Sequence, residues 1–212
     1  MLKPKSRWIV KKSDQTVIDS LAKELNINHL TASLLVNRGL DTVEDARYFL
    51  FGQKSEFHDP YLLKDMDKAI ERINKAIETQ EPILVFGDYD ADGVSSTTVM
   101  MKALAELGAN ADYYIPNRFT EGYGPNEKAF WSAADSGVGL IITVDTGISA
   151  LHEAAVAKEV GIDLIITDHH EPGPVLPDAF AIIHPKLDDS VYPFKDLAGV
   201  GVAFKVAHAL LG

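Results

Sequence analysis

The sequence contains no cysteine, so disulfide bonds and thiolate metal sites are excluded. Long apolar runs are also missing: no segment approaches membrane-spanning length, and residues 1–10 lack the apolar core of a signal peptide. We therefore expect a protein without a membrane partner. The lack of cysteine fits the reducing cytoplasm, and we expect the protein to act there.

Two kinds of sequence motif are absent as well. Neither a Gly-x-Gly-x-x-Gly pattern nor a Walker phosphate loop occurs, so a nucleotide cradle lacks its usual signature. The Gly-x-Ser-x-Gly elbow of serine hydrolases is also missing. Together with the lack of cysteine, this leaves little support for a hydrolase that uses a covalent nucleophile.

The net charge of −11 is spread unevenly along the 212 residues. Residues 1–80 carry 13 Lys and Arg against 12 Asp and Glu, whereas residues 81–212 carry 7 against 19. An acidic second part argues against broad, nonspecific binding of nucleic acid. It does not exclude an enzyme of nucleic acids whose metal ions neutralise the site locally.

The first third of the chain has the pattern of short helices. Asp14 can cap the first of them, and Gly39 stands where a helix ends in a left-handed residue. Asp59-Pro60 interrupts the pattern, and Asp65 then starts a longer helix. We therefore predict a small helical module over residues 1–64 and a second domain over residues 65–212.

From residue 82 onward, strand and helix patterns alternate. Short apolar runs predict strands at 83–88, 111–115, 139–145, 162–168 and 179–183. The segments between them predict helices at about 93–107, 126–135, 149–160 and from 199 onward. Such repeats with uniformly apolar strands predict an α/β fold, with a mainly parallel sheet and helices on both faces.

Three aspartates follow the first predicted strand at every second position: Asp88, Asp90 and Asp92. Carboxylates this close repel one another unless a cation lies between them, and hard divalent cations prefer oxygen ligands. The spacing also opens calcium-binding EF-hand loops, but Val99 stands where such a loop needs glutamate. Another alternative stays open, a solvated turn in which Asp92 or Ser95 caps the next helix.

Further strands also end in chemically active side chains. Asp145 ends the third predicted strand, and Asp168-His169-His170 ends the fourth. Parallel strands bring their carboxyl ends to one edge of the sheet, so these side chains should meet the aspartates. Carboxylates with imidazole suit Mn²⁺ or Mg²⁺, and a bridging Asp145 could hold two ions ~3.5–4 Å apart, as in phosphoryl transfer. His184 ends another strand and is a further candidate for this edge.

The acidic and histidine motifs together resemble a known family. Gly87-Asp88-Tyr89-Asp90-Ala91-Asp92-Gly93, Val144-Asp145-Thr146-Gly147 and Asp168-His169-His170 are similar to motifs I, II and III of the DHH phosphoesterase superfamily. Other segments resemble its branch of single-strand-specific 5′→3′ exonucleases: Asn37–Leu40, Asn117-Arg118 with Glu121–Gly124, and Tyr192–Lys195 with Leu197–Lys205. The resemblance covers essentially the whole chain.

The resemblance implies a site for two Mn²⁺ or Mg²⁺ ions. Asp90 and Asp145 correspond to ligands of one ion, and Asp88 is an additional candidate there. Asp92, Asp145 and His169 correspond to ligands of the second ion. Asp145 would therefore bridge the two.

Catalytic and substrate-binding roles are implied in the same way. His170 corresponds to the residue that contacts the scissile phosphate, and Asp168 to a partner that orients His169. Arg118, on a glycine-rich loop, is a candidate phosphate clamp, with an ordinary surface arginine as the alternative. We count His184 as a second candidate phosphate contact.

The sequence departs from the superfamily pattern in two ways. Many members have a histidine four residues before the position of Asp90, where this chain has Phe86, so the first ion lacks that ligand. The resemblance also implies a fourth motif with another metal-binding aspartate, then a DHHA1 domain and an OB-type domain. We expect a chain truncated before motif IV, with most of the metal site and little of the single-strand channel.

The implied function is a metal-dependent phosphodiesterase that hydrolyses single-stranded DNA from 5′ to 3′ in recombination and repair. Its partners would be single-stranded DNA, replication or repair proteins, and the missing C-terminal domains. One alternative is a DHH phosphodiesterase for short oligoribonucleotides or cyclic dinucleotides. Another is a non-catalytic scaffold that keeps the fold for partner binding. The intact acidic and histidine positions favour an enzyme.

Overall fold

The computed structural model describes residues 9, 12–52 and 57–212. The chain forms two compact units, Met1–Phe57 and His58–Gly212. The residues that precede the predicted boundary at 64/65, including the single-turn helix η1 (Pro60–Leu62), therefore pack with the second unit. The remaining parts of the predicted helical module, residues 1–8, 10–11 and 53–56, lie outside the described residues.

The first unit contains helices α1 (Gln15–Leu25), α2 (His29–Asn37) and α3 (Val43–Phe51). Each begins at a polar side chain that accepts a hydrogen bond from the backbone of the first turn, and these caps are Asp14, Asn28 and Thr42. The predicted cap at Asp14 and the left-handed Gly39, with φ +82°, are both confirmed. The core of this unit is small and consists of Ile18, Leu21, Ala22, Leu25, Ala32, Leu35 and Ala46.

The second unit is built on a parallel five-stranded sheet in the order β2-β1-β3-β4-β5. Its strands are β1 (Ile83–Phe86), β2 (Ala111–Tyr114), β3 (Leu140–Val144), β4 (Asp163–Thr167) and β5 (Ala181–Ile183). The predicted parallel α/β sheet is confirmed. Chain order reverses at β1, since β2 lies on one side of it and β3 on the other. Such a reversal is where open sheets of this kind bind ligands.

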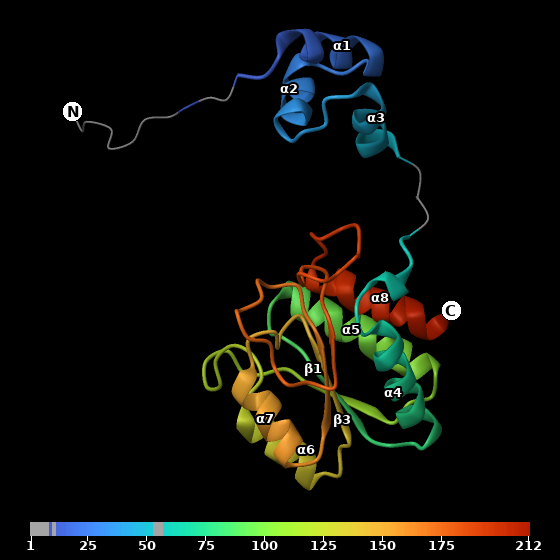
Figure 1. Ribbon diagram of the computed structural model, residues 1–212, viewed down its shortest axis with the longest axis vertical. Coiled ribbons are helices and arrows are strands. Elements are labelled where there is room, and N and C mark those ends of the chain that lie inside the picture. The colour runs from blue at the N-terminus through green and yellow to red at the C-terminus, as the bar shows by residue number, and fades with distance from the viewer. Residues whose placement is uncertain (1–8, 10–11, 53–56) are drawn as a thin grey trace, which may run out of the picture. The chain divides into compact units, whose positions relative to one another are not determined.

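Helices cover both faces of the sheet, as the sequence predicts (Figure 1). The first face carries α4 (Met66–Glu78), α5 (Ala91–Glu106) and α8 (Gly199–Leu211). The second face carries α6 (Glu127–Asp135) and α7 (Leu151–Glu159). Both cores are fully apolar at their centres, which is why the strands are apolar on both sides. Within the described ranges, no helix is long and apolar enough to cross a membrane.

A buried arginine holds the amino ends of three strands together. Arg72, on α4, donates to both carboxylate oxygens of Glu81 at 2.8 Å and to Asp163 at 2.6 Å. It also donates to the carbonyl oxygen of Gly139. These partners precede or begin β1, β4 and β3, so the edge opposite the predicted site is fixed by one side chain.

Strand β1 is shorter than predicted and stops at Phe86. The Phe86 ring is fully buried, stacked on Tyr114 at 5.3 Å and edge-on to Phe130 at 6.1 Å between ring centres. This position therefore contributes core packing and offers no metal ligand. Gly87 and Asp88 follow as irregular backbone that leaves the sheet toward α5.

Candidate metal centre

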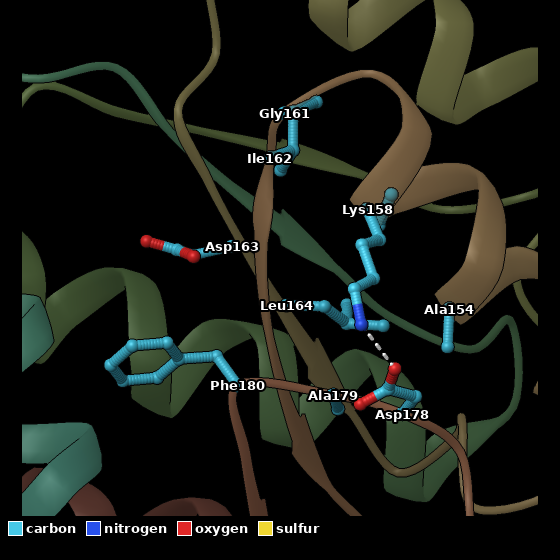
Figure 2. Close-up of a pocket in the computed structure, with 10 residues that line it drawn as sticks. Ala154, Lys158, Gly161, Ile162, Asp163, Leu164, Asp178, Ala179 and Phe180 are labelled. Carbon is cyan, nitrogen blue, oxygen red and sulfur yellow. Dashed lines mark hydrogen bonds and ion pairs between the residues drawn. The ribbon is translucent and has the colours of Figure 1, made fainter.

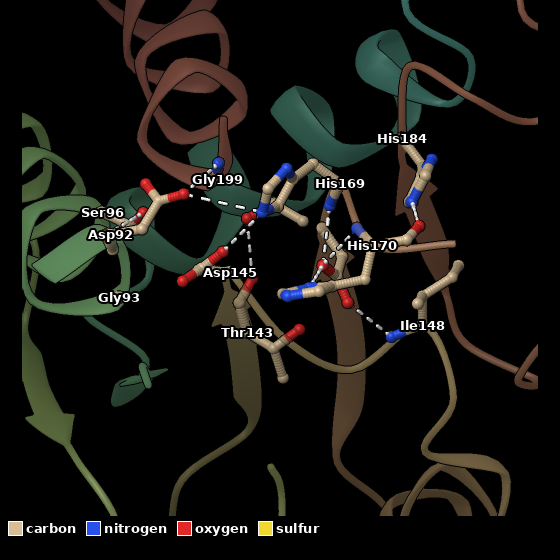
Figure 3. A network of polar contacts seen from close by, with 12 residues as sticks. Asp92, Gly93, Ser96, Thr143, Asp145, Ile148, His169, His170, His184 and Gly199 are labelled. Carbon is tan, nitrogen blue, oxygen red and sulfur yellow. Dashed lines mark hydrogen bonds and ion pairs between the residues drawn. The ribbon is translucent and has the colours of Figure 1, made fainter. Parts of the chain in front are cut away.

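The carboxyl ends of β1, β3 and β4 meet at one edge of the sheet. Asp88 and Asp90 follow β1, Asp145 follows β3, and Asp168 follows β4. Asp92 reaches the same region from the first turn of α5 (Figure 3). The residues predicted to form the metal site are thus brought together from four elements.

Asp145 lies at the centre of this cluster. Its side chain is almost completely buried, and Oδ1 makes no hydrogen bond to any residue that the structure describes. Burial, followed by the charges of Asp92 and Asp90, raises the pKa of Asp145 to about 7. Its backbone is left-handed, with φ +61°, a conformation that aspartate tolerates better than most residues. Backbone strain and a buried, unsatisfied carboxylate are common signs of a functional position.

Asp88 and Asp90 complete one ligand group with Asp145. Ligand atoms of these three side chains all lie within 4.8 Å of one another. Asp88 is also buried, its Oδ1 has no hydrogen-bond partner among the described residues, and burial raises its pKa. Only glycine fits at position 93, since a Cβ atom there would lie 2.5 Å from the Asp88 carbonyl oxygen. The tight turn between strand and helix therefore depends on Gly93.

An aspartate does cap the helix that follows β1, as the alternative reading of this segment expected, but it is a different residue from the two proposed. Asp90, rather than Asp92 or Ser95, caps α5: its Oδ1 accepts from the backbone N–H groups of Asp92 and Gly93 at 2.8 and 2.9 Å. Capping and metal binding are therefore not exclusive, because a carboxylate has two oxygens.

Asp92 contacts a second helix that the sequence did not connect to it. Its two oxygens accept from the backbone N–H groups of Gly199 and Val200, at 2.8 and 2.7 Å, at the start of α8. Gly199 lies so close to Asp145 that a Cβ atom would stand 2.2 Å from Oδ1. The first turn of α8 thus forms one wall of the site, although sequence reasoning gave it no role there.

His169 faces the carboxylates. Its Nε2 atom lies 3.1 Å from Asp145 Oδ1 and 3.6 Å from Asp92 Oδ2, and the ring is about one-quarter exposed. This contact to Asp145 is close enough for an ion pair but does not have hydrogen-bond geometry, so Asp145 Oδ1 has no hydrogen-bond partner. Asp145, His169 and His170 form a second group whose ligand atoms lie within 4.8 Å of one another.

Asp168 orients His170 rather than His169, which corrects the predicted pairing. Its Oδ1 lies 2.7 Å from His170 Nδ1, and Oδ2 accepts from the backbone N–H of Ile148 at 2.9 Å. It meets His169 only through that residue's backbone N–H. Partial burial disfavours the charged His170 ring, but the hydrogen bond and charge of Asp168 outweigh this effect and raise the pKa of His170.

His184 is not a phosphate contact, which corrects a second expectation. Its side chain is completely buried, and burial lowers its pKa. Nε2 donates to the carbonyl oxygen of His170 at 2.8 Å, and Nδ1 accepts from the backbone N–H of Lys186 at 3.1 Å. With both nitrogens engaged, the ring has nothing left for a substrate.

Arg118 lies at the rim of the site with two tyrosines. Its guanidinium stands 4.7 Å from the centre of the Tyr89 ring, and Tyr89 meets Tyr123 edge-on at 6.4 Å. The Tyr123 hydroxyl lies 3.5 Å from both ring nitrogens of His170. Burial and the charge of Asp168 raise the pKa of Tyr123 to about 12, so it stays a hydroxyl. The sequence pointed to Tyr123 only through the glycine-rich segment Glu121–Gly124, which resembles the family but gave this tyrosine no role.

The donor set fits hard divalent cations. It offers aspartate oxygens and imidazole nitrogen, which suit Mn²⁺, and Mg²⁺ where oxygen predominates. Among the described residues, buried oxygens of Asp88 and Asp145 have no hydrogen bond, which is costly unless a cation satisfies them. The same burial raises the pKa of Asp145.

A well-formed pocket lies at the other end of β4 (Figure 2). It is lined by Gly161, Ile162 and Phe180, and an ion pair between Lys158 Nζ and Asp178 Oδ2, at 2.6 Å, crosses it. It contains no group of metal-ligating side chains. Both groups of candidate metal ligands in the described chain lie at the carboxyl edge instead.

Comparison with known proteins identifies the family of this chain. Residues 82–211 match the DHH family, N-terminal domain. The chain therefore belongs to the DHH family. It is 60% identical over its whole length to the single-stranded-DNA-specific exonuclease RecJ of Bacillus subtilis, and 46% identical over 149 residues to RecJ of Escherichia coli, which covers 70% of this chain. It spans only about a quarter of these relatives, 27% and 26% of their lengths.

Solved structures show the same fold. The chain is similar to exonuclease RecJ bound to manganese, with a TM-score of 0.65, 36% identity, and coverage of 70% of this chain and 37% of that one. It is also similar to RecJ of Thermus thermophilus in complex with Mn²⁺, with a TM-score of 0.70, 27% identity, and coverage of 93% and 27%.

Proposed function

We propose that this chain carries the metal centre of a Mn²⁺- or Mg²⁺-dependent phosphodiesterase that hydrolyses single-stranded DNA in the 5′→3′ direction. The observation that carries the proposal is the convergence of three strand ends, two of which bear a buried carboxylate, Asp88 and Asp145, with one oxygen that makes no hydrogen bond. The relatives named as single-stranded-DNA-specific exonucleases, and the similar structure bound to manganese, support the substrate and the metal.

Asp145 belongs to two groups of close ligand atoms, one with Asp88 and Asp90 and one with the two neighbouring histidines. Asp90 and Asp145 would hold one ion, with Asp88 beside them. Asp145 and His169 would hold the second together with Asp92, whose oxygens accept hydrogen bonds from the backbone of α8. When bound, two such ions supply neutralisation of phosphate charge and activation of water. Asp145 must give up its proton to bridge them, because a ligating carboxyl group is deprotonated.

The remaining side chains act on the substrate. Asp168 accepts the Nδ1 proton of His170 and so fixes its ring, while the raised pKa favours a ring that can donate a hydrogen bond to a phosphate oxygen. Arg118 at the rim is our candidate for a second phosphate contact. Tyr123, beside His170, would help to close this side of the site.

We place this activity in DNA recombination and repair in the cytoplasm. The proposal concerns the metal centre, because the relatives are far longer than the 212 residues. Holding a single strand needs a basic groove and stacking side chains, which we expect from the fourth motif, DHHA1 and OB-type domains of the whole protein. Replication or repair proteins are its expected partners.

Titration of Mn²⁺ by calorimetry tests the metal centre. We expect the chain to bind Mn²⁺, Asp145→Asn to abolish binding, and Asp178→Asn to leave it unchanged, since Asp178 is an exposed acid far from the cluster. Binding that survives Asp145→Asn would refute the site. Hydrolysis is then measured on end-labelled single-stranded DNA, duplex DNA and a cyclic dinucleotide. Preference for the dinucleotide, or metal binding without any cleavage, would favour the alternative functions.

A further inference from the structure

The hydrogen bonds between β4 and β5 stop at Asp168, just before the two histidines, His169 and His170. The register pairs Thr167 with Ile183, and the last ladder bond runs from the Asp168 N–H to the Ile183 carbonyl at 3.3 Å. Beyond it, the His170 N–H bonds to the carboxylate of Asp168 instead of continuing the ladder. The backbone at His170 therefore leaves the sheet without a strand partner.

The imidazole of His184 bridges this gap. Its Nε2–H donates to the His170 carbonyl at 2.8 Å, and its Nδ1 accepts from the Lys186 N–H at 3.1 Å. A carbonyl can only accept and an N–H can only donate, so these partners require one neutral tautomer, protonated at Nε2. Figure 3 shows His184 directed at the backbone of His170, from the strand next to it.

We propose that His184 is a positioning residue that fixes the backbone of His170 and thereby aligns the His170 ring against Asp168. A buried polar ring is costly unless its hydrogen bonds are made, and an apolar side chain would fill the end of β5 without that cost. The bond to the His170 carbonyl accounts for an imidazole at this position. Its effect on turnover rests on the proposed function, whereas its effect on the His170 ring does not.

Two substitutions separate the two hydrogen bonds from simple packing. His184→Gln places an amide N–H near the position of Nε2 and keeps the donor to His170, whereas His184→Ala removes both bonds. Ile183→Val is the matched control, because it removes one methyl group from the neighbouring buried residue without touching these bonds.

The first measurement is nuclear magnetic resonance of the histidine rings in the metal-free chain. We expect His184 to show the Nε2–H tautomer in the wild type. The His170 ring signals should move in His184→Ala toward their positions in Asp168→Asn, and stay near the wild type in His184→Gln and Ile183→Val. Unchanged His170 signals in His184→Ala would overturn the proposal, whether or not the protein cleaves DNA.

The second measurement is steady-state hydrolysis with Mn²⁺. A misplaced group next to the reacting phosphate typically lowers rates by roughly 10- to 100-fold, so His184→Ala should lose that much kcat with little change in KM. His184→Gln should recover most of the activity. Equal losses in His184→Ala and Ile183→Val would mean a purely structural role. If the wild type shows no hydrolysis, the result counts against the proposed activity of these 212 residues and not against the positioning role, which the ring signals then decide.

Discussion

At the scale of single residues, the site is governed by the burial of Asp145. Its pKa of about 7 lies far above the ordinary value of 3.8, so the folded chain keeps this proton at pH values where the unfolded chain has lost it. The folded state is then favoured most below pH ~4, and the contribution is lost as pH rises through about 7. The metal-free protein therefore becomes less stable over this window because of Asp145.

This effect predicts a difference between two melting profiles. Metal-free wild type and Asp145→Asn are compared from pH 4 to pH 8, and the substitution should stabilise the chain progressively as pH rises. Asparagine keeps the shape of the side chain without its charge, so the difference in melting temperature between the two proteins should be near zero at pH 4 and largest above pH 7. A gap that does not change with pH would mean that Asp145 titrates at its ordinary value.

Metal affinity should have the opposite dependence on pH. Binding requires deprotonated Asp145, so Mn²⁺ affinity should fall below pH 7 and binding should release a proton there. Calorimetry in buffers of different ionisation enthalpy measures that proton directly. No proton release at pH 6 would contradict the assignment of Asp145 as the bridging ligand.

A single methyl group at the start of α8 should also disrupt the site. In Gly199→Ala the new Cβ would stand 2.2 Å from Asp145 Oδ1, so carboxylate or helix must move. We expect a loss of stability of about 1–3 kcal/mol and at least a tenfold loss in Mn²⁺ affinity. Gly201→Ala is the control, because its Cβ meets only the flexible Leu197 side chain, at 3.1 Å. Equal effects of the two changes on affinity would refute this account.

Sequence reasoning found most candidate ligands because the signal is local. An aspartate that ends an apolar strand lies at the carboxyl edge wherever the strand sits in the sheet, and this holds for Asp88 and Asp145. The role of His184 depends on a contact with His170 across two strands, which no local pattern encodes. The same applies to Asp92 and Gly199, which are 107 positions apart.

At the scale of elements, apolar runs predicted every strand and its direction, but the ends were less accurate. Helix α5 begins at Ala91, two residues earlier than predicted, so strand β1 stops at Phe86 and the chain turns between them. The carboxyl edge is thus built of short irregular segments, while the amino edge is fixed by Arg72.

A change at the amino edge of the sheet should lower the stability of the fold without changing metal binding at the carboxyl edge. Arg72→Met leaves Glu81 and Asp163 without their partner, and both are partly exposed, so we expect a loss of about 1–3 kcal/mol in unfolding free energy. Urea denaturation measures this loss, and calorimetry at a temperature where the variant is folded should give unchanged Mn²⁺ affinity. Reduced affinity would show that the amino edge also shapes the site.

At the scale of the whole molecule, the two units have separate cores, and in the smaller unit the described residues contribute a core of seven buried side chains. A core of that size is marginal by itself. We expect the first unit to melt at a lower temperature than the second, as two transitions in calorimetry. A fragment of residues 58–212 should bind Mn²⁺ with the affinity of the whole chain. A single transition, or a fragment that loses affinity, would contradict this independence.

The concentration of carboxylates at one edge sets an order of events. Without a divalent ion, a phosphate that approaches Asp88, Asp90 and Asp145 meets only acidic side chains, and two of them, Asp88 and Asp145, are buried. Once ions are held there, the same edge attracts the phosphate. For the proposed phosphodiesterase, metal would therefore arrive first and nucleic acid second. Free Mn²⁺ would then act as the first substrate in its kinetic scheme, and the concentration of metal would decide when the proposed site accepts a strand.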